Sequence, residues 1–193
     1  MYEYLQGKIT EIKPSNLVLE VGGIGYFINV SLNTFSKLKE KKEAKVYIHQ
    51  VVREDALLLY GYAQKSEREI FRYLISVSGV GANTATVMLS SLSPGEVKKA
   101  VLTENENVLK SVKGIGAKTA KRIILDLKDK ISKAETDDSQ IAIPVNDTVE
   151  EASAALIMLG FNKKAIEKVV PKLQKEQPDI SVENLVKTAL KRL

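Results

Sequence analysis

The sequence predicts an α+β protein with several domains: a five-stranded β-barrel of the OB type at the N-terminus, an all-α domain in the middle and a three-helix domain at the C-terminus. Three observations predict this order. Short apolar stretches that alternate as in strands fill the first third of the chain. Two copies of a Gly-x-Gly sequence, each followed by a helical pattern, lie in the middle. A polar stretch with a proline then precedes a last group of short helical patterns.

The barrel is expected to occupy residues 1–64. Short strands in close succession, joined by tight turns such as "VGGIGY" (residues 21–26), are typical of a small closed barrel. A longer polar connection at residues 33–45 separates the third strand from the fourth. The strands are predicted at residues 2–12, 17–21, 26–30, 46–52 and 57–62.

The middle domain, residues 65–132, has a helical period. Ser66 and Glu69 have the spacing of a capping box, and "SPGE" (residues 93–96) repeats that spacing with proline at the first helical position. The sequences "SGVGANTA" (residues 78–85) and "KGIGAKTA" (residues 113–120) keep a separation of 35 residues at both glycines. We therefore expect the unit helix–hairpin–helix to occur twice.

Three kinds of function compete for these hairpins. A dinucleotide fingerprint needs a preceding strand and a third glycine, but both hairpins follow helices and Thr84 and Thr119 stand at that place. A P-loop needs glycine immediately before Lys-Thr, where this chain has Ala117. A turn that binds no ligand, and a helix-hairpin-helix that binds DNA, both remain open.

A DNA-binding hairpin uses glycine so that backbone amides and the positive end of the next helix can approach a phosphate. Such contacts reach no base edge, so binding is expected to be independent of sequence. The segment 65–132 holds twelve Lys and Arg against seven Asp and Glu, which favours DNA binding. The candidate DNA contacts are Gly79, Val80, Gly81 and Asn83 in the first hairpin, and Gly114, Ile115, Gly116, Lys118, Thr119, Lys121 and Arg122 in the second.

Composition excludes several other classes of protein. The 193 residues include no cysteine and a single histidine, His49, so disulfides, thiol catalysis and a histidine metal cluster are excluded. No catalytic residue, metal site or cofactor is predicted. The chain has no apolar run of transmembrane length and no signal-peptide core, so we expect a soluble cytoplasmic protein with no membrane partner.

The last part of the chain is expected to be a linker and a small domain. Residues 133–146 are polar and acidic and contain Pro144, which is typical of a flexible linker. Residues 147–193 contain three helical patterns, at 149–159, 163–173 and 182–193, and predict a UBA-like three-helix domain. A domain of this size is marginally stable alone, and we expect it to bind a partner.

The chain resembles the RuvA family, bacterial proteins that bind Holliday junctions. The resemblance rests on "VGGIGY" and "VVREDALLLYGY" in the barrel, on the paired hairpins, and on "ALIMLGF" after the linker. It implies a homotetramer, one or two per junction, that holds Holliday junction DNA open. It also implies recruitment of the RuvB hexameric ATPase for branch migration in recombination, DNA repair and the SOS response, with the RuvC resolvase as a further partner.

The resemblance also implies roles for particular residues. Arg53 would contact DNA, and Glu54 and Asp55 would form an acidic pin at the centre of the tetramer; taken alone, such a tip is also typical of an ordinary solvated turn. The chain departs from its relatives at Asn83 and Ala117, where they carry lysine. The residues implied to dock the ATPase, which helical spacing alone would equally assign to the domain core, are Leu156, Leu159, Phe161 and Leu190.

An enzyme is the main rival interpretation. A helix-hairpin-helix DNA glycosylase needs an aspartate in a loop well beyond the hairpin, but Asp126 and Asp129 fall inside the following helix. A nuclease needs paired acidic residues with metal-site spacing, and none stands out. We therefore expect a non-catalytic DNA-binding subunit, with a general duplex-binding repair subunit as the remaining alternative.

Overall fold

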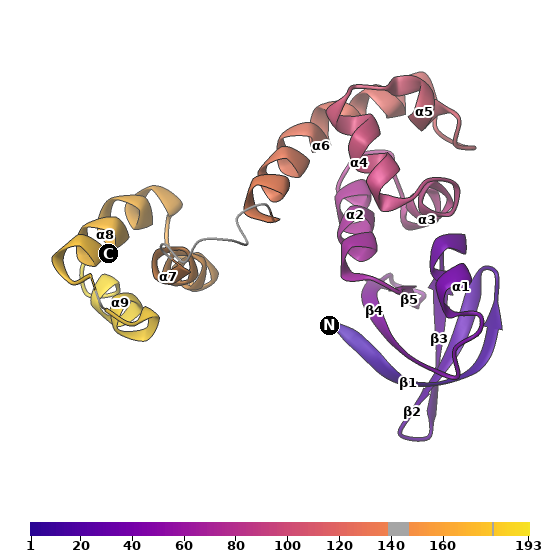
Figure 1. The fold of residues 1–193 in the computed structure, drawn as a ribbon, viewed down its shortest axis with the longest axis horizontal. Helices are drawn as coiled ribbons and strands as arrows, with labels where there is room; N and C mark the ends of the chain where they lie inside the picture. The colour runs from indigo at the N-terminus through magenta and orange to yellow at the C-terminus, as the bar shows by residue number, and fades with distance from the viewer. Residues whose placement is uncertain (139–146, 179) are drawn as a thin grey trace. The chain divides into compact units, whose positions relative to one another are not determined.

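The computed structural model describes residues 1–138, 147–178 and 180–193, without the side chains of residues 133–138 and 147. The chain divides into two compact units, Met1–Asp138 and Ser139–Leu193. Figure 1 labels the elements of both units, and each unit is described by itself below.

The first unit begins with a closed barrel, which confirms the predicted five-stranded fold. Its strands follow the order β1-β2-β3-β5-β4, and all neighbouring pairs are antiparallel except β3 and β5, which are parallel. Alternate residues such as Leu17 and Leu19 of β2 point into the barrel and are fully buried. The strands are β1 (Tyr4–Lys13), β2 (Asn16–Val21), β3 (Ile24–Val30), β4 (Glu43–Val52) and β5 (Leu57–Tyr62).

A short helix, α1 (Leu32–Leu38), occupies the start of the polar connection expected at residues 33–45. Ser31 caps it by accepting a hydrogen bond from the Thr34 amide at 3.0 Å. Helix α1 lies beside α3, where Asn33 Nδ2 donates to the carbonyls of Leu89 (2.6 Å) and Leu92 (3.2 Å). The connection is therefore part of the contact between the barrel and the helices.

The helical part of the first unit follows β5 almost directly, and it confirms the predicted all-α segment. One of the two predicted capping boxes forms: Ser93 Oγ accepts from the Glu96 amide (3.2 Å) and Glu96 Oε2 from the Ser93 amide (2.7 Å). The box expected at Ser66 and Glu69 is wrong, because the helix already begins at Lys65 with Gln64 as N-cap. The helices are α2 (Lys65–Ile75), α3 (Ala82–Ser91), α4 (Pro94–Leu102), α5 (Glu106–Lys110) and α6 (Ala117–Asp138).

The interior of the barrel has a core of its own, and a second hydrophobic core joins β5 to the helices. Phe71 of α2 stacks on Tyr60 of β5 with ring centroids 5.3 Å apart, and its ring also contacts Tyr62 at 5.2 Å and His49 at 5.3 Å. All three aromatic residues Tyr60, Tyr62 and Phe71 are buried among apolar side chains of α2 to α6. This shared core fixes the helical motifs against the barrel.

Helix α6 continues to Asp138, so the start of the predicted linker is wrong: residues 133–138 are helical. Lysine, alanine and glutamate at this end of the helix are good helix formers, and no glycine or proline interrupts them before Pro144. The rest of the predicted linker, residues 139–146, lies outside the described residues.

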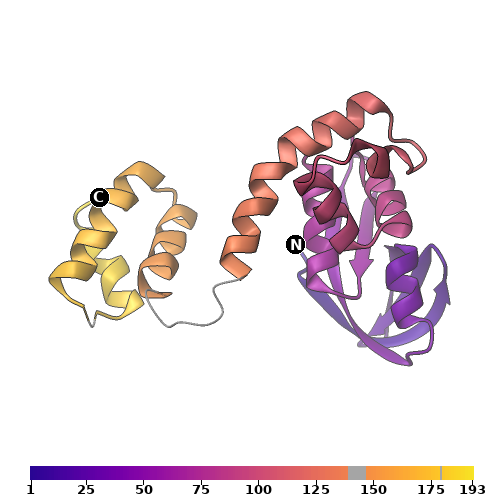
Figure 2. The same cartoon turned by 45° about the horizontal axis from the view of Figure 1, so that its top comes forward.

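The second unit contains the three helices that were predicted, and Figure 2 gives a second view of them. They are α7 (Asp147–Met158), α8 (Lys163–Glu176) and α9 (Val182–Ala189), packed around Ala152, Leu156, Ile166, Val170 and Leu185. Gly160, two residues beyond the last residue of α7, has a φ of +92° and its amide donates to Ile157 O (3.0 Å), which terminates the helix. In the described parts of both units, no helix combines the length and the hydrophobicity required to cross a membrane.

Candidate nucleic-acid interface

The two glycine hairpins have the same geometry. Gly79 and Gly114 adopt left-handed φ values of +91° and +93°, which residues other than glycine rarely adopt. The following residues close equivalent turns: the Val80 amide donates to Val77 O at 3.0 Å and the Ile115 amide to Val112 O at 3.1 Å. The 35-residue repeat in the sequence is therefore a repeat in structure.

Each hairpin leads into a helix whose first turn is open. Gly81 precedes α3 and accepts the Ala85 amide at 2.9 Å, and Gly116 accepts the Ala120 amide at 2.9 Å at the start of α6. At α3, no side chain in the described residues caps this first turn. The leading amides of a helix have no partner within it and carry its positive dipole end, so both hairpins present anion-binding groups.

The second glycine of each hairpin is not explained by contacts within the chain. A Cβ built on Gly81 or Gly116 meets no described atom within 4 Å, and neither residue has a left-handed φ. Glycine is tolerated at an N-cap, but serine, aspartate or asparagine would be a better cap. An open position with no side chain next to free amides favours close approach of an external group, such as a phosphate.

Val80 and Ile115, both expected from the sequence to contact DNA, have buried side chains. Their side chains are only 4% and 5% exposed and lie in the core. Their amides are already used in the turns of the hairpins. These two residues anchor the hairpins, and the free amides belong to the first turns of α3 and α6.

The positive charge is concentrated at the second hairpin. Lys118, Lys121 and Arg122 are all exposed there, and Thr119 is half-buried between them. Lys113 is also exposed next to Gly114, although sequence reasoning did not select it. Its place within "KGIGAKTA" was the signal that could have identified it.

Helix α6 brings part of this charge to the first hairpin. Arg122 Nη1 donates to Ser78 O at 3.2 Å, across 44 residues of sequence. Further along the same helix, Lys130 Nζ lies 3.2 Å from Ser76 Oγ. The two hairpins are therefore neighbours in space, and a guanidinium lies between them.

Asn83 contacts the barrel. Its Oδ1 accepts a hydrogen bond from the Tyr60 hydroxyl at 3.0 Å. Burial raises the pKa of Tyr60, and the positive charge of Arg53 partly offsets that rise. The start of α3, which follows the first hairpin, is therefore hydrogen-bonded to β5.

The tip itself is a tight exposed turn. Arg53, Glu54 and Asp55 are all exposed, and the turn is closed by the Arg53 amide, which donates to Ala56 O at 2.9 Å. The strands below it are paired up to Val52 and Leu57, so the tip stands on a regular ladder. The three charged side chains are free to face a ligand.

The candidates in the second unit divide into core and surface. Leu156 is fully buried and Phe161 packs partly against the same core, so Leu156 is not available as a docking residue. Leu159 and Leu190 are exposed, at 60% and 41%. Sequence reasoning missed the exposed Ile157 and Met158, although four consecutive apolar residues on one helix cannot all face a core.

The closed barrel and the duplicated hairpin define a DNA-binding protein of the helix-hairpin-helix class. Residues 1–61 match the RuvA N terminal domain, residues 71–129 the SAM-like helix-hairpin-helix tandem and residues 147–193 the RuvA C-terminal domain. The chain is 52% identical to the Holliday junction branch migration complex subunit RuvA of Christiangramia forsetii. It is 48% and 49% identical to the proteins of the same name from Bacteroides fragilis and Bacteroides thetaiotaomicron, in each case over the full length of both chains. The chain belongs to the RuvA family.

Proposed function

We propose that the chain binds four-way DNA junctions, independently of sequence, as the non-catalytic DNA-binding subunit of a branch migration complex. The observation that carries the proposal is the pair of equivalent hairpins, each leading to an open helix N-terminus, joined in one unit by Arg122. The names of the relatives support a Holliday junction as the form of DNA.

The contacts that the hairpins offer are contacts to phosphate. A phosphate oxygen could approach Gly81 and Gly116 closely. The amides of these glycines and of the helical turns that follow would donate hydrogen bonds to it. Lys113, Lys118 and Lys121 would add charge around the second hairpin, and Arg122 has donors left beyond the one it gives to Ser78 O. A contact set of this kind reads the backbone and no base, so affinity should depend steeply on salt.

The acidic tip supports a preference for junctions. Glu54 and Asp55 would repel phosphates, which disfavours a continuous duplex across the place they occupy. We propose that four copies assemble as a homotetramer, with one or two tetramers on a junction, so that four tips meet the crossover. Arg53, beside the two carboxylates, would instead attract a phosphate.

The second unit would dock the motor. Ile157, Met158, Leu159 and Leu190 are exposed apolar side chains that could bind an apolar surface of the RuvB ATPase, with Phe161 at their edge. The RuvC resolvase would be a further partner on the same DNA. Holliday junctions form in chromosomal DNA, so the proposed location is the cytoplasm.

The proposal assigns no chemical step to the chain. Within the described residues, no group of three or more His, Asp or Glu side chains is arranged to hold a metal ion. The carboxylates after the second hairpin, Asp126 and Asp129, are exposed on α6. We propose that ATP hydrolysis belongs to the partner and that the chain itself uses no cofactor.

The test compares a four-way junction with a duplex of the same sequence and length. Fluorescence anisotropy at matched salt should give tighter binding to the junction, light scattering should give the mass of a tetramer, and denaturing gels should show unchanged strands. Equal affinity for both DNA forms would favour a general duplex-binding subunit. Cleaved or base-depleted strands would favour an enzyme.

A further inference from the structure

Two consecutive charged residues in the first turn of α2 are buried. Glu67 is 0% exposed and Arg68 is 1% exposed. Buried charges are costly unless they are paired and hydrogen-bonded, so both residues must have specific partners. Only Ala63 and Gln64 separate β5 from α2, and the two charges lie where the barrel joins the helices.

Glu67 attaches α2 to the start of α1. Its carboxylate accepts hydrogen bonds from Ser31 Oγ and from Thr34 Oγ1, the latter at 3.0 Å. Thr34 Oγ1 in turn accepts the Ala63 amide at 3.0 Å. Burial raises the pKa of Glu67, and the two hydroxyl groups oppose that rise. The network ties α1 to α2 and to the connection before it.

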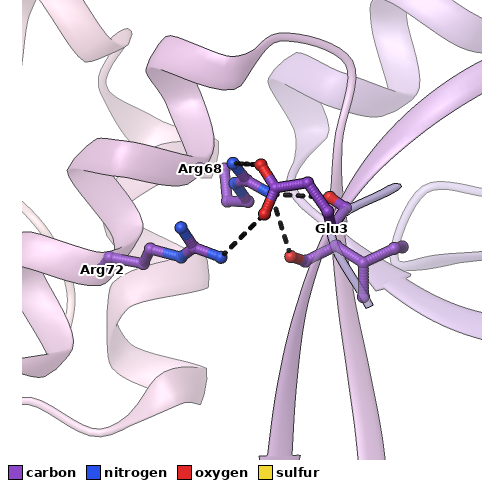
Figure 3. Close-up of polar contacts among 4 residues, drawn as sticks. Glu3, Arg68 and Arg72 are labelled. Atoms are coloured by element: carbon purple, nitrogen blue, oxygen red, sulfur yellow. Dashed lines mark hydrogen bonds and ion pairs between the residues drawn. The ribbon is translucent and has the colours of Figure 1, made fainter. Parts of the chain in front are cut away.

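Arg68 connects the same turn of α2 to β4 and to the residue before β1. Its guanidinium donates to Glu3 O at 2.6 Å, to Ile48 O at 3.4 Å and to the Glu3 carboxylate. Figure 3 shows Arg68 and Arg72 converging on Glu3, with Arg72 Nη2 3.8 Å from Glu3 Oε2. The hydrogen bond from Arg68 lowers the pKa of Glu3, which keeps that carboxylate ionised.

The two attachments act on elements that lead to the candidate DNA contacts. Strand β4, which Arg68 contacts at Ile48, ends in the acidic tip. Helix α2 leads into the first hairpin, and α1, which Glu67 contacts through Thr34, lies beside α3. A helix held on two sides cannot rotate about either attachment, so the tip and the hairpins keep a fixed separation.

We propose that Glu67 and Arg68 are positioning residues that hold the barrel and the hairpins in the orientation that discriminates a junction from a duplex. The inference rests on the proposed function. The stacking of Phe71 on Tyr60 and its contact with Tyr62 do not depend on either charge, so the fold should survive conservative changes. What the changes should alter is the angle between two parts that remain folded.

The test uses Glu67→Gln, Thr34→Val and Arg68→Lys, with Glu69→Gln as control. Glu69 is exposed on the same helix, so its replacement removes a charge without touching the attachments. Because the chain has no cysteine, spin labels can be placed at Glu20→Cys on the barrel and Lys99→Cys on α4, both exposed. Pulsed electron paramagnetic resonance then measures the distance between them, in samples diluted with unlabelled chain of the same variant.

The three test variants should broaden or shift the label distance and lower the ratio of junction to duplex affinity by about tenfold, the equivalent of one charge-assisted hydrogen bond. The salt dependence of binding should stay unchanged, since the phosphate contacts are intact; a simple loss of folded protein would lower both affinities alike. Unchanged distances, or altered distances with a retained junction preference, would overturn the inference. A wild-type chain without junction preference would refute the proposed function instead, and the label distances would still test the attachment.

Discussion

Two of the four hairpin glycines have a left-handed φ and two do not. Alanine substitutions at the two pairs therefore test backbone strain and phosphate binding separately. Gly79 and Gly114 have φ of +91° and +93°, whereas Gly81 and Gly116 lie outside the left-handed region. A Cβ at any of the four meets no described atom within 4 Å, so no clash inside the chain complicates the comparison.

Alanine at Gly79 or Gly114 should destabilise the first unit by about 1–2 kcal/mol, because an L-residue is strained at that φ. For a unit of this size the melting temperature should fall by about 3–8 °C. Alanine at Gly81 or Gly116 should leave the melting temperature nearly unchanged. Alanine makes the unfolded chain less flexible, which stabilises the fold, but it is a poorer N-cap than glycine, which destabilises the helix by a similar amount. Junction affinity should nevertheless fall about tenfold or more, because a methyl group separates the phosphate from charge-assisted hydrogen bonds with the amides.

The assay pairs thermal unfolding with anisotropy titrations of a junction at one salt concentration. Gly160→Ala is the matched control for strain, because Gly160 has φ of +92° and open space around its Cβ position but lies in the second unit. It should lower stability without changing DNA affinity. Normal junction binding by folded Gly81→Ala and Gly116→Ala would refute the reasoning and leave the hairpins as turns.

Four further changes, in charge, chain length and pH, have expected outcomes. Lys118→Ala should weaken binding to junctions of every arm sequence alike and reduce the slope of log affinity against log salt by about 0.9 for each phosphate that the variant no longer neutralises; weaker binding confined to one arm sequence contradicts contacts to the backbone. The double change Glu54→Gln/Asp55→Asn should alter the free energy of unfolding by no more than about 0.5 kcal/mol. It should raise affinity for duplex more than for junction, because phosphates meet less repulsion at the tip, and titrations unchanged for both DNA forms would leave the tip as an ordinary turn. A chain truncated after residue 138 should still bind junctions in gel shifts but fail to support ATPase-driven branch migration; loss of junction binding would assign DNA contacts to the second unit. Burial, and then the charges of two neighbouring arginines, lower the pKa of His49, so below a pH of about 6.5 the unfolded chain binds more protons than the folded chain. Stability should therefore fall as the pH drops through that value and level off below the folded-state pKa; an identical pH profile for His49→Gln would contradict this.

The barrel and the hairpins could be predicted because their signals are local. Strand alternation and a repeated glycine spacing depend only on residues close in sequence. The short helices α1 and α5 were missed, since seven and five residues are too few to show a helical period. The Ser93–Glu96 box formed and the Ser66–Glu69 box did not, because α2 begins at Lys65, before Ser66, with Gln64 as its N-cap.

The sequence predicts which residues belong to the candidate site, but it does not predict which of their atoms are available to contact a ligand. A motif places Val80 and Ile115 in the hairpins, but only the fold shows that their amides close the turns. Likewise, Leu156 and Met158 belong to one apolar run, and only packing separates the buried side chain from one that is 89% exposed. Contacts across long stretches of sequence, such as Arg122 with Ser78, leave no local pattern.

The two hairpins have the same backbone geometry but differ in the charge of their side chains. We expect this difference to give them different roles in DNA recognition. The first hairpin has no lysine of its own, and Asn83 in the helix that follows it is hydrogen-bonded to Tyr60 of β5, the strand that follows the acidic tip. The second hairpin is surrounded by exposed cations and supplies Arg122 to its neighbour. We expect charge to govern affinity and its salt dependence, and the position of the first hairpin relative to the tip to govern which DNA shape fits. Changes at Lys118 should therefore alter affinity for all DNA alike, while Asn83→Ala, which releases the Tyr60 hydroxyl, should alter the preference for a junction with little effect on the salt slope. Equal loss of junction and duplex affinity in the Asn83 variant would mean that both hairpins serve affinity alone.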